Sequence, residues 1–424
     1  MCTSVSAPPR RCPDMPDLPE GKGPHGMRMP HEHIPVALFE RRLPAMIDDI
    51  GRLVRTESPS ADLAAVARSA NAVAATAAPY LGTGPELITL DGRTHLRWRL
   101  GSGPRRLLLL GHHDTVWPIG SLDTHPFTVL DGVLRGPGCF DMKAGLVMAF
   151  HAIAALGAGA AAGTTLLITG DEEIGSPSSR ELIESEAAGC AAALVLEASA
   201  DGGALKTERK GVSLYGIQVG GRAAHAGLEP HRGVNAGIET AHQILAVAAL
   251  SDPGGGTTVT PTRVTAGTTA NTVPAHSRFS VDVRVRDVAE QTRVDTALHG
   301  LRPVLDGATV EVTGGPNRPP LPHSASDALY RRAARLAGEL GLAPLTAAAV
   351  GGASDGNFTA GAGVPTLDGL GAVGGGAHAA DEPVVVSELP RRTALLAALI
   401  AGLLAEYPRP ARDSDTATTG GSTR

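Results

Sequence analysis

Short apolar runs alternate along the first half of the chain with segments in which apolar residues recur every three or four positions. Each run ends in polar residues, which is typical of a buried strand with a helix before and after it. The runs are RRLLLLGHHDTV (105–116), TTLLITG (164–170) and AAALVLEAS (191–199), and the helical segments include 36–58, 143–156 and 178–188. This alternation predicts a three-layer α/β/α fold, in which helices cover both faces of a mostly parallel sheet. The last of these helices has a capping-box spacing, Ser178 followed by Glu181, at its start.

The pattern changes in the middle of the chain. A strand (211–221), a helix (233–250), two strands (262–273 and 278–287), a helix near 288–302 and a strand (308–315) follow one another there. This β-α-β-β-α-β order predicts a ferredoxin-like α+β insert over residues 211–316. Because a helix at 325–340 resumes the earlier pattern, we expect a discontinuous outer domain made of 34–210 and 317–407.

The two ends of the chain follow neither pattern. Residues 1–33 are rich in proline and charge, and residues 408–424 are polar and of low complexity, so both are expected to be disordered tails. The first tail has no apolar run of signal-peptide length, and no later stretch reaches the roughly 18 uninterrupted apolar residues of a membrane span. We therefore expect a cytoplasmic protein without a membrane partner.

The charge balance excludes two further classes of partner. The chain has 37 Lys and Arg against 43 Asp and Glu, and its net charge of −6 provides no basic field for nucleic acid or an anionic membrane. Its four cysteines lie far apart, so a disulfide scaffold is not expected. Chemistry on a small molecule or a short peptide is the favoured function class.

Polar residues of metal-binding types follow the predicted strands. His112 and Asp114 lie two positions apart at a strand end, where their side chains project to one face and the carboxylate can orient a metal-binding imidazole. A loop histidine is the alternative for His112, and His113 is assigned no role. Asp141, in GPGCFDMKAGL, follows a glycine-rich turn and precedes a helix, so it either caps that helix or bridges two cations with its two oxygens.

Three adjacent carboxylates, Asp171, Glu172 and Glu173, follow the second run. In a turn, one glutamate can bind a metal while its neighbour faces an open coordination position. Divalent cations would supply the positive charge that offsets their mutual repulsion. For this stretch alone, a solvated acidic loop is the alternative.

Two further residues complete a candidate ligand set. Glu197 ends the third run, where helix capping or solvent exposure is the usual explanation, and His378 lies among small residues where an imidazole has little packing value. In doubly wound folds, sites gather at the carboxyl ends of the strands. The set of two imidazoles and three carboxylates, which suits a pair of zinc ions, is His112, Asp141, Glu173, Glu197 and His378.

The chain resembles the di-zinc exopeptidases and amidohydrolases, a family that includes folate-hydrolysing glutamate carboxypeptidases, aminoacylases, acetylornithine deacetylase and succinyl-diaminopimelate desuccinylase. The matching stretches span about residues 36–407 in the expected order. They are GHHDTV, GPGCFDMKAG, GDEEIGS, LVLEAS, GRAAHAG, NTVPA, GGASDGNF and GGGAHAADE.

This resemblance implies roles for the residues of the metal centre. It implies that His112 and Glu197 hold one metal, that His378 and Glu173 hold the other, and that Asp141 bridges them. The metals would be two Zn²⁺ per subunit, with Co²⁺ or Mn²⁺ also compatible with these ligands. Glu172 would be the general base, Asp114 would orient His112, and the Asp141–Met142 peptide would be cis.

The resemblance also implies that the insert is a lid and homodimerisation domain. His225 would reach a neighbouring active site and stabilise the tetrahedral intermediate. Asn271 and Arg284 would contact the carbonyl and the carboxylate of the substrate, although Arg284 is also consistent with a plain strand-exposed arginine. At Ser354 the family usually has threonine, and backbone donors there would bind the substrate carboxylate.

The expected activity is metal-dependent hydrolysis of an amide bond. The product would be a C-terminal amino acid, with glutamate as the expected example, released from a peptidyl or N-acyl conjugate. The alternative enzyme is an N-acyl-amino-acid deacylase, such as a biosynthetic deacylase. A non-catalytic binding relative is the third hypothesis, and the intact Glu172 argues against it.

Overall fold

A computed structural model describes residues 34–406, so the two expected tails lie outside the described residues. A six-stranded sheet forms the centre of the outer domain. Its strands, in spatial order, are β1 (Glu86–Leu90), β2 (Arg93–Arg99), β6 (Thr164–Thr169), β3 (Leu107–His112), β7 (Ala192–Val195) and β14 (Thr366–Leu367). The four strands from β6 to β14 run parallel. At one edge, β2 pairs with β6 in antiparallel orientation, and β1 pairs with β2 in the same way. The predicted parallel sheet is therefore confirmed, and the antiparallel edge was not predicted.

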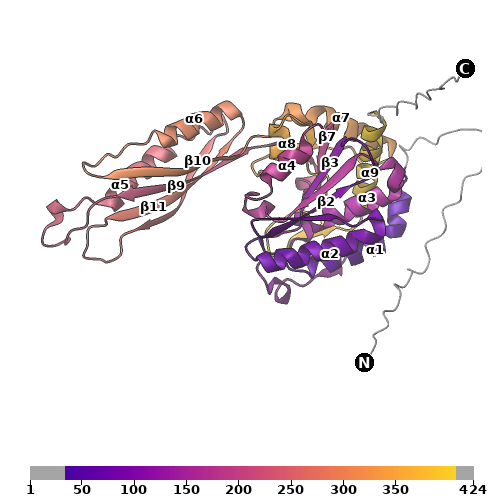
Figure 1. The fold of residues 1–424 in the computed structure, drawn as a ribbon, viewed down its shortest axis with the longest axis horizontal. Helices are drawn as coiled ribbons and strands as arrows, with labels where there is room; N and C mark the ends of the chain where they lie inside the picture. Colours follow the sequence, from indigo (N-terminus) through magenta and orange to yellow (C-terminus); the bar gives the residue numbers. More distant parts are fainter. Residues whose placement is uncertain (1–33, 407–424) are drawn as a thin grey trace, which may run out of the picture. The chain divides into compact units, whose positions relative to one another are not determined.

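Strand β3 shows why this fold has three layers. Leu107 and Leu109 belong to one apolar core, while Leu108 and Leu110 belong to another, because successive side chains of a strand point to opposite faces. The first core contains residues of α1 (Val36–Val54), α2 (Leu63–Leu81), α3 (Ala144–Ala160), α7 (His323–Glu339) and α9 (Glu388–Glu406), and the second contains residues of α4 (Arg180–Ala187) and α8 (Gly356–Gly361). Figure 1 shows these helices around the sheet.

One helical segment, Cys139–Gly157, is long and apolar enough to cross a membrane. It includes most of α3, which packs against α1, α2 and α9. Because 78% of its most apolar window is buried inside the fold, its composition is explained by its place in the core.

The inserted segment forms a second sheet with the strand order β10-β11-β9-β12. Its elements follow the predicted β-α-β-β-α-β sequence: β9 (Gly211–Gly220), α5 (Ala236–Ala248), β10 (Thr258–Ala266), β11 (His276–Val285), α6 (Val288–His299) and β12 (Thr309–Arg318). All neighbouring strands are antiparallel, and both helices pack on this sheet. The strand predicted at 262–273 ends at Ala266, because Gly267 turns the chain with a φ of +71°.

The insert begins and ends at neighbouring positions. Near the start of β9, Val212 is the register partner of Arg318, the last residue of β12. Two small sheets complete the outer domain: β8 (Leu205–Arg209) with β13 (Ala347–Val350), and β15 (Pro383–Val385) with β5 (Val133–Arg135) and β4 (Thr128–Leu130). The pairing of β15 with β5 brings the segment after His378 towards the turn that contains Asp141.

Candidate active site

The three adjacent carboxylates at 171–173 differ in their partners. Asp171 accepts hydrogen bonds from the hydroxyl groups of Ser178 at 2.6 Å and Ser179 at 2.5 Å. Helix α4 begins at Arg180 after Ser179, with no side-chain cap, so the capping box predicted from Ser178 and Glu181 is wrong. The serine hydroxyls instead donate to the Asp171 carboxylate, whose partners are therefore neutral groups.

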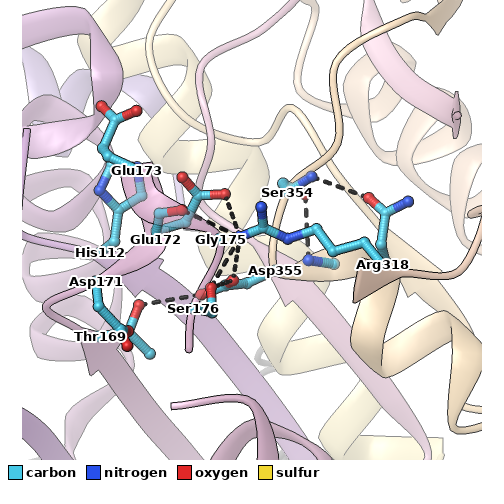
Figure 2. Close-up of polar contacts among 12 residues, drawn as sticks. His112, Thr169, Asp171, Glu172, Glu173, Gly175, Ser176, Arg318, Ser354 and Asp355 are labelled. Atoms are coloured by element: carbon cyan, nitrogen blue, oxygen red, sulfur yellow. Dashed lines mark hydrogen bonds and ion pairs between the residues drawn. The ribbon is translucent and has the colours of Figure 1, made fainter. Parts of the chain in front are cut away.

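Glu172 pairs with an arginine that the sequence did not predict. Arg318 donates from Nη2 to Glu172 Oε1 at 2.9 Å, to Asp355 Oδ1 at 2.9 Å and to Ser176 Oγ at 2.8 Å. Figure 2 shows this guanidinium reaching all three side chains. Burial raises the pKa of the Glu172 carboxyl well above its usual range, and the positive charge of Arg318 opposes that shift.

His112 lies at the end of β3, as expected. Its Nε2 atom is 3.2 Å from Asp141 Oδ1 and 3.4 Å from Glu197 Oε1. Its Nδ1 atom is 3.0 Å from the Asp114 carbonyl oxygen and 3.4 Å from Asp114 Oδ1. The Asp114 carboxylate also accepts the backbone N–H groups of Glu172 and Glu173, both at 3.2 Å. This single buried carboxylate therefore contacts the imidazole and anchors the turn that presents both glutamates.

The structure brings His112 and His378 to opposite oxygens of Asp141. His378 Nε2 lies 3.3 Å from Asp141 Oδ2 and 3.2 Å from Glu173 Oε2. Hydrogen bonds to Asp141 and Glu173 raise the pKa of His378 to about 10. The Asp141–Met142 peptide is cis, which confirms that expectation.

The chemistry of these donors fits divalent cations. Ligand atoms of His112, Asp141 and Glu173 lie within 4.8 Å of one another, and so do those of His112, Glu172 and Glu197. Glu173 Oε1 is buried and has no hydrogen-bond partner among residues 34–406, so it is free to act as a ligand. Imidazole nitrogens mixed with carboxylate oxygens are ligands that suit zinc and related ions.

Two positively charged side chains lie beside the cluster. Arg209 is buried and donates from Nε to Asp368 at 2.7 Å, and its Nη2 atom lies 3.6 Å from Glu197. Lys206 is half-buried, lies within electrostatic reach of Asp141 and Glu197, and forms no ion pair within 4.0 Å in the described part of the chain. Its side chain passes Gly369, where an added Cβ would lie 3.3 Å from Lys206 Cγ.

The four residues predicted to contact substrate lie in different surroundings. Ser354 is fully buried, and its hydroxyl donates to Asp368 at 2.6 Å. Arg284 is partly exposed and makes a two-pronged ion pair with Asp282 at 2.7 and 2.8 Å. The predicted contacts of these two residues with substrate are not tested by this geometry.

His225 and Asn271 lie in the inserted domain. His225 is exposed, and its Nδ1 atom accepts the backbone N–H groups of Gly227 and Leu228. The Asn271 carbonyl accepts from the Ala226 N–H, so the two predicted residues come from adjoining segments. No hydrogen bond or ion pair within residues 34–406 links either side chain to the cluster, and their roles stay predictions.

Comparison with known proteins gives a consistent result. Residues 108–402 match the model of the peptidase family M20/M25/M40. Carboxypeptidase G2 from Pseudomonas sp. (strain RS-16) is 31% identical over 315 residues, which are 72% of this chain and 75% of that protein. A succinyl-diaminopimelate desuccinylase from Xanthomonas euvesicatoria pv. vesicatoria is 29% identical over 346 residues, covering 77% of this chain and 91% of that protein.

Solved structures share the fold. An M20 family metallo-carboxypeptidase from Sulfolobus solfataricus superposes with a TM-score of 0.68 at 18% identity, covering 85% of this chain and 99% of that one. A tripeptidase from Staphylococcus aureus gives a TM-score of 0.65 at 21% identity, with 85% and 98% covered.

Proposed function

The chain belongs to the peptidase family M20/M25/M40 and is a metal-dependent hydrolase of that family, and from this premise we propose that it cleaves an amide bond to release a C-terminal amino acid. The proposed substrate is a peptidyl or N-acyl conjugate, with glutamate as the amino acid released. The observation that carries the proposal is the placement of His112 and His378 at opposite oxygens of Asp141, with Glu172 in the same cluster.

We assign two divalent cations per subunit to this cluster, with zinc as the first candidate and cobalt or manganese as alternatives. His112 and Glu197 would hold one, His378 and Glu173 the other, and Asp141 both. When bound, such cations polarise a carbonyl group and lower the pKa of water.

Glu172 is the proposed general base. Its carboxylate would accept the proton of the attacking water and then deliver it to the leaving amine. Since burial favours the neutral acid, the nearby charge of Arg318 helps to keep Glu172 ionised and able to accept that proton. Asp114 would hold the His112 ring and the backbone of the Glu172 turn at the same time.

Recognition of the substrate carboxylate requires a positively charged side chain whose charge is not already neutralised by an acidic partner. Arg284 is the residue that the sequence suggests, and it shares its charge with Asp282. We therefore add Lys206 as a second candidate, since its ammonium lies beside the cluster without an ion-pair partner in the described residues. His225 is proposed to stabilise the tetrahedral intermediate, Asn271 to contact the substrate carbonyl, and backbone donors around Ser354 to contact the carboxylate.

The alternative activity is deacylation of an N-acyl amino acid. The desuccinylase relative supports it, because that protein covers as much of this chain as the carboxypeptidase does. The two activities differ only in which side of the amide carries the larger group, so a panel that varies each side separately distinguishes them.

We also propose a homodimer formed through the inserted domain. Strand β10 is an edge strand, and α5 packs next to it. Apolar side chains are exposed on both elements: Ile238 and Leu245 on α5, and Val264 on β10. An exposed edge strand beside apolar side chains is a surface that a second copy can cover.

A hydrolysis screen with metal analysis tests the activity. Wild-type protein and Glu172→Ala would be assayed on dipeptides, N-acyl amino acids and glutamate conjugates. We expect the variant to retain its metals and to lose roughly 10²- to 10⁴-fold in rate, the usual contribution of a general base. Glu184→Ala, which removes a partly exposed carboxylate of α4 that pairs with Arg180 of the same helix, is the matched control. Undiminished turnover by Glu172→Ala would show that another group is the base.

A further inference from the structure

Glu382 is a buried carboxylate that the proposed mechanism does not use. Only 2% of the residue is exposed. Its Oε1 atom accepts the backbone N–H groups of Phe140 at 2.7 Å and Asp141 at 3.2 Å. Its Oε2 atom accepts the indole N–H of Trp117 at 3.0 Å and the backbone N–H of Gly138 at 3.4 Å. Four donors therefore converge on one side chain, three of them from the segment that presents Asp141.

Through its position in the chain, Glu382 connects two segments of the site. Glu382 lies four residues after His378, and its carbonyl oxygen accepts a hydrogen bond from the Cys139 thiol at 3.4 Å. The strand β15 begins at the next residue, Pro383, which is paired with Arg135 of β5. Both the side chain and the backbone of Glu382 thus connect the His378 segment with the Asp141 turn.

His378 has little other support. Its side chain is about half exposed, and its φ of +66° lies in the left-handed region that non-glycine residues seldom adopt. Its Nε2 atom must nevertheless remain near Asp141 and Glu173, which come from two other segments. Metal sites tolerate displacements of only about 0.5 Å in their ligands, so the relative position of these segments matters.

We propose that Glu382 is a positioning residue that fixes His378 relative to Asp141 and thereby sets the affinity for the cation shared by His378, Glu173 and Asp141. The proposal rests on the metal assignment made above. Asp141 also holds the other cation, but the remaining ligands of that cation, His112 and Glu197, lie at the ends of strands of the central sheet and have no hydrogen bond or ion pair with Glu382 within residues 34–406. Loss of Glu382 should therefore weaken the binding of the cation at His378 more than the binding of the cation at His112.

Titration of metal-free protein with Co²⁺, followed by visible absorption and calorimetry, measures the two affinities. Glu382→Gln keeps the size of the side chain but places an amide N–H₂ against N–H donors. We expect it to bind one Co²⁺ as wild type does and the second about 10- to 100-fold more weakly, the usual cost of losing a partner that orients a metal ligand. Glu388→Gln, a change in a glutamate at the start of α9, is the control and should match wild type.

A second variant tests the same proposal in case Glu382→Gln does not fold. Trp117→Phe removes one of the four donors and keeps an aromatic ring at the position that lies beside His125. It should weaken the same cation by a smaller, few-fold factor, with circular dichroism of the metal-free protein unchanged. The proposal would be overturned if Glu382→Gln weakened the binding of both cations equally, or if the folded variant bound both with wild-type affinity. If Glu382→Gln does not fold, unchanged affinities in Trp117→Phe would overturn it. Failure of the wild type to bind two cations would instead refute the proposed metal centre itself.

Discussion

Arg318 donates a hydrogen bond from Nη2 to Glu172 Oε1 at 2.9 Å, with both side chains about nine-tenths buried. The same guanidinium nitrogen contacts Asp355. Removing one partner of a buried ion pair leaves an uncompensated charge, which costs about 3–5 kcal/mol. Arg318→Met should therefore lower the free energy of unfolding by about that amount in a denaturant titration.

The same variant should also lower kcat by at least about 10-fold, because Glu172 would lose the charge that opposes its protonation and the contact that holds its carboxylate in place. Arg331→Met is the matched control, since Arg331 lies on α7 with most of its side chain exposed. A variant with normal kcat on a substrate of the wild-type enzyme would show that Glu172 works without Arg318.

Cation binding should depend on pH in a defined direction. Hydrogen bonds to Asp141 and Glu173 raise the pKa of His378 to about 10 in the metal-free protein, so its imidazole is protonated at neutral pH. Because a metal ligand must be neutral, binding releases at least one proton, and the apparent affinity should rise about 10-fold or more per pH unit below that pKa. Calorimetry in buffers of different ionisation enthalpy counts the protons released. An affinity that stays constant from roughly pH 6 to pH 8 would contradict this linkage.

Lys206→Met should weaken the recognition of substrates that carry a free carboxylate. A hydrogen bond to a charged group contributes about 1.5–3 kcal/mol, so kcat/KM should fall by about 10- to 100-fold. The matched control is the corresponding substrate amide, for which wild type and variant should perform alike. The same assay on Arg284→Met measures how much Arg284, the other candidate, contributes to recognition of the substrate carboxylate. Equal losses on the acid and the amide would assign Lys206 to the stability of the cluster instead.

Leu245→Arg should disrupt the proposed homodimer. Leu245 lies on α5 with 71% of its surface exposed, and a charge there would have to be buried if a second copy covers it. Light scattering coupled to size exclusion should report a dimer for the wild type and a monomer for the variant. Leu87→Arg, on the exposed part of β1, should leave the mass unchanged. A wild-type monomer would refute the dimer.

Much of the cluster could be expected from the sequence, because parallel strands end at the same edge of a sheet. His112 is the last residue of β3, the glutamates follow β6, and Glu197 follows β7. Their meeting was therefore a consequence of the predicted fold. The alternation of strands and helices likewise predicted both sheets, but not the antiparallel strand β2, whose arginines obscure its apolar residues.

Other contacts had no local signal in the sequence. Arg318 lies 146 residues from Glu172, and nothing in its neighbourhood indicates an acidic partner. Glu382 was part of a recognised motif, yet its partners are backbone amides in a distant turn, which a sequence pattern does not display. Ser178 and Glu181 fitted a capping box, but the helix begins only at Arg180, so Ser178 precedes the N-cap residue Ser179 and its hydroxyl donates to Asp171 instead.

The pairing of Val212 with Arg318 means that the inserted domain is entered and left through adjacent positions. A whole domain can be exchanged at such a point during evolution without redirecting the chain in the central sheet. Arg318 is the exception, because it ends the last inserted strand and also pairs with Glu172. Any inserted domain joined to the central sheet at this point must therefore end in a residue that keeps the contact with Glu172.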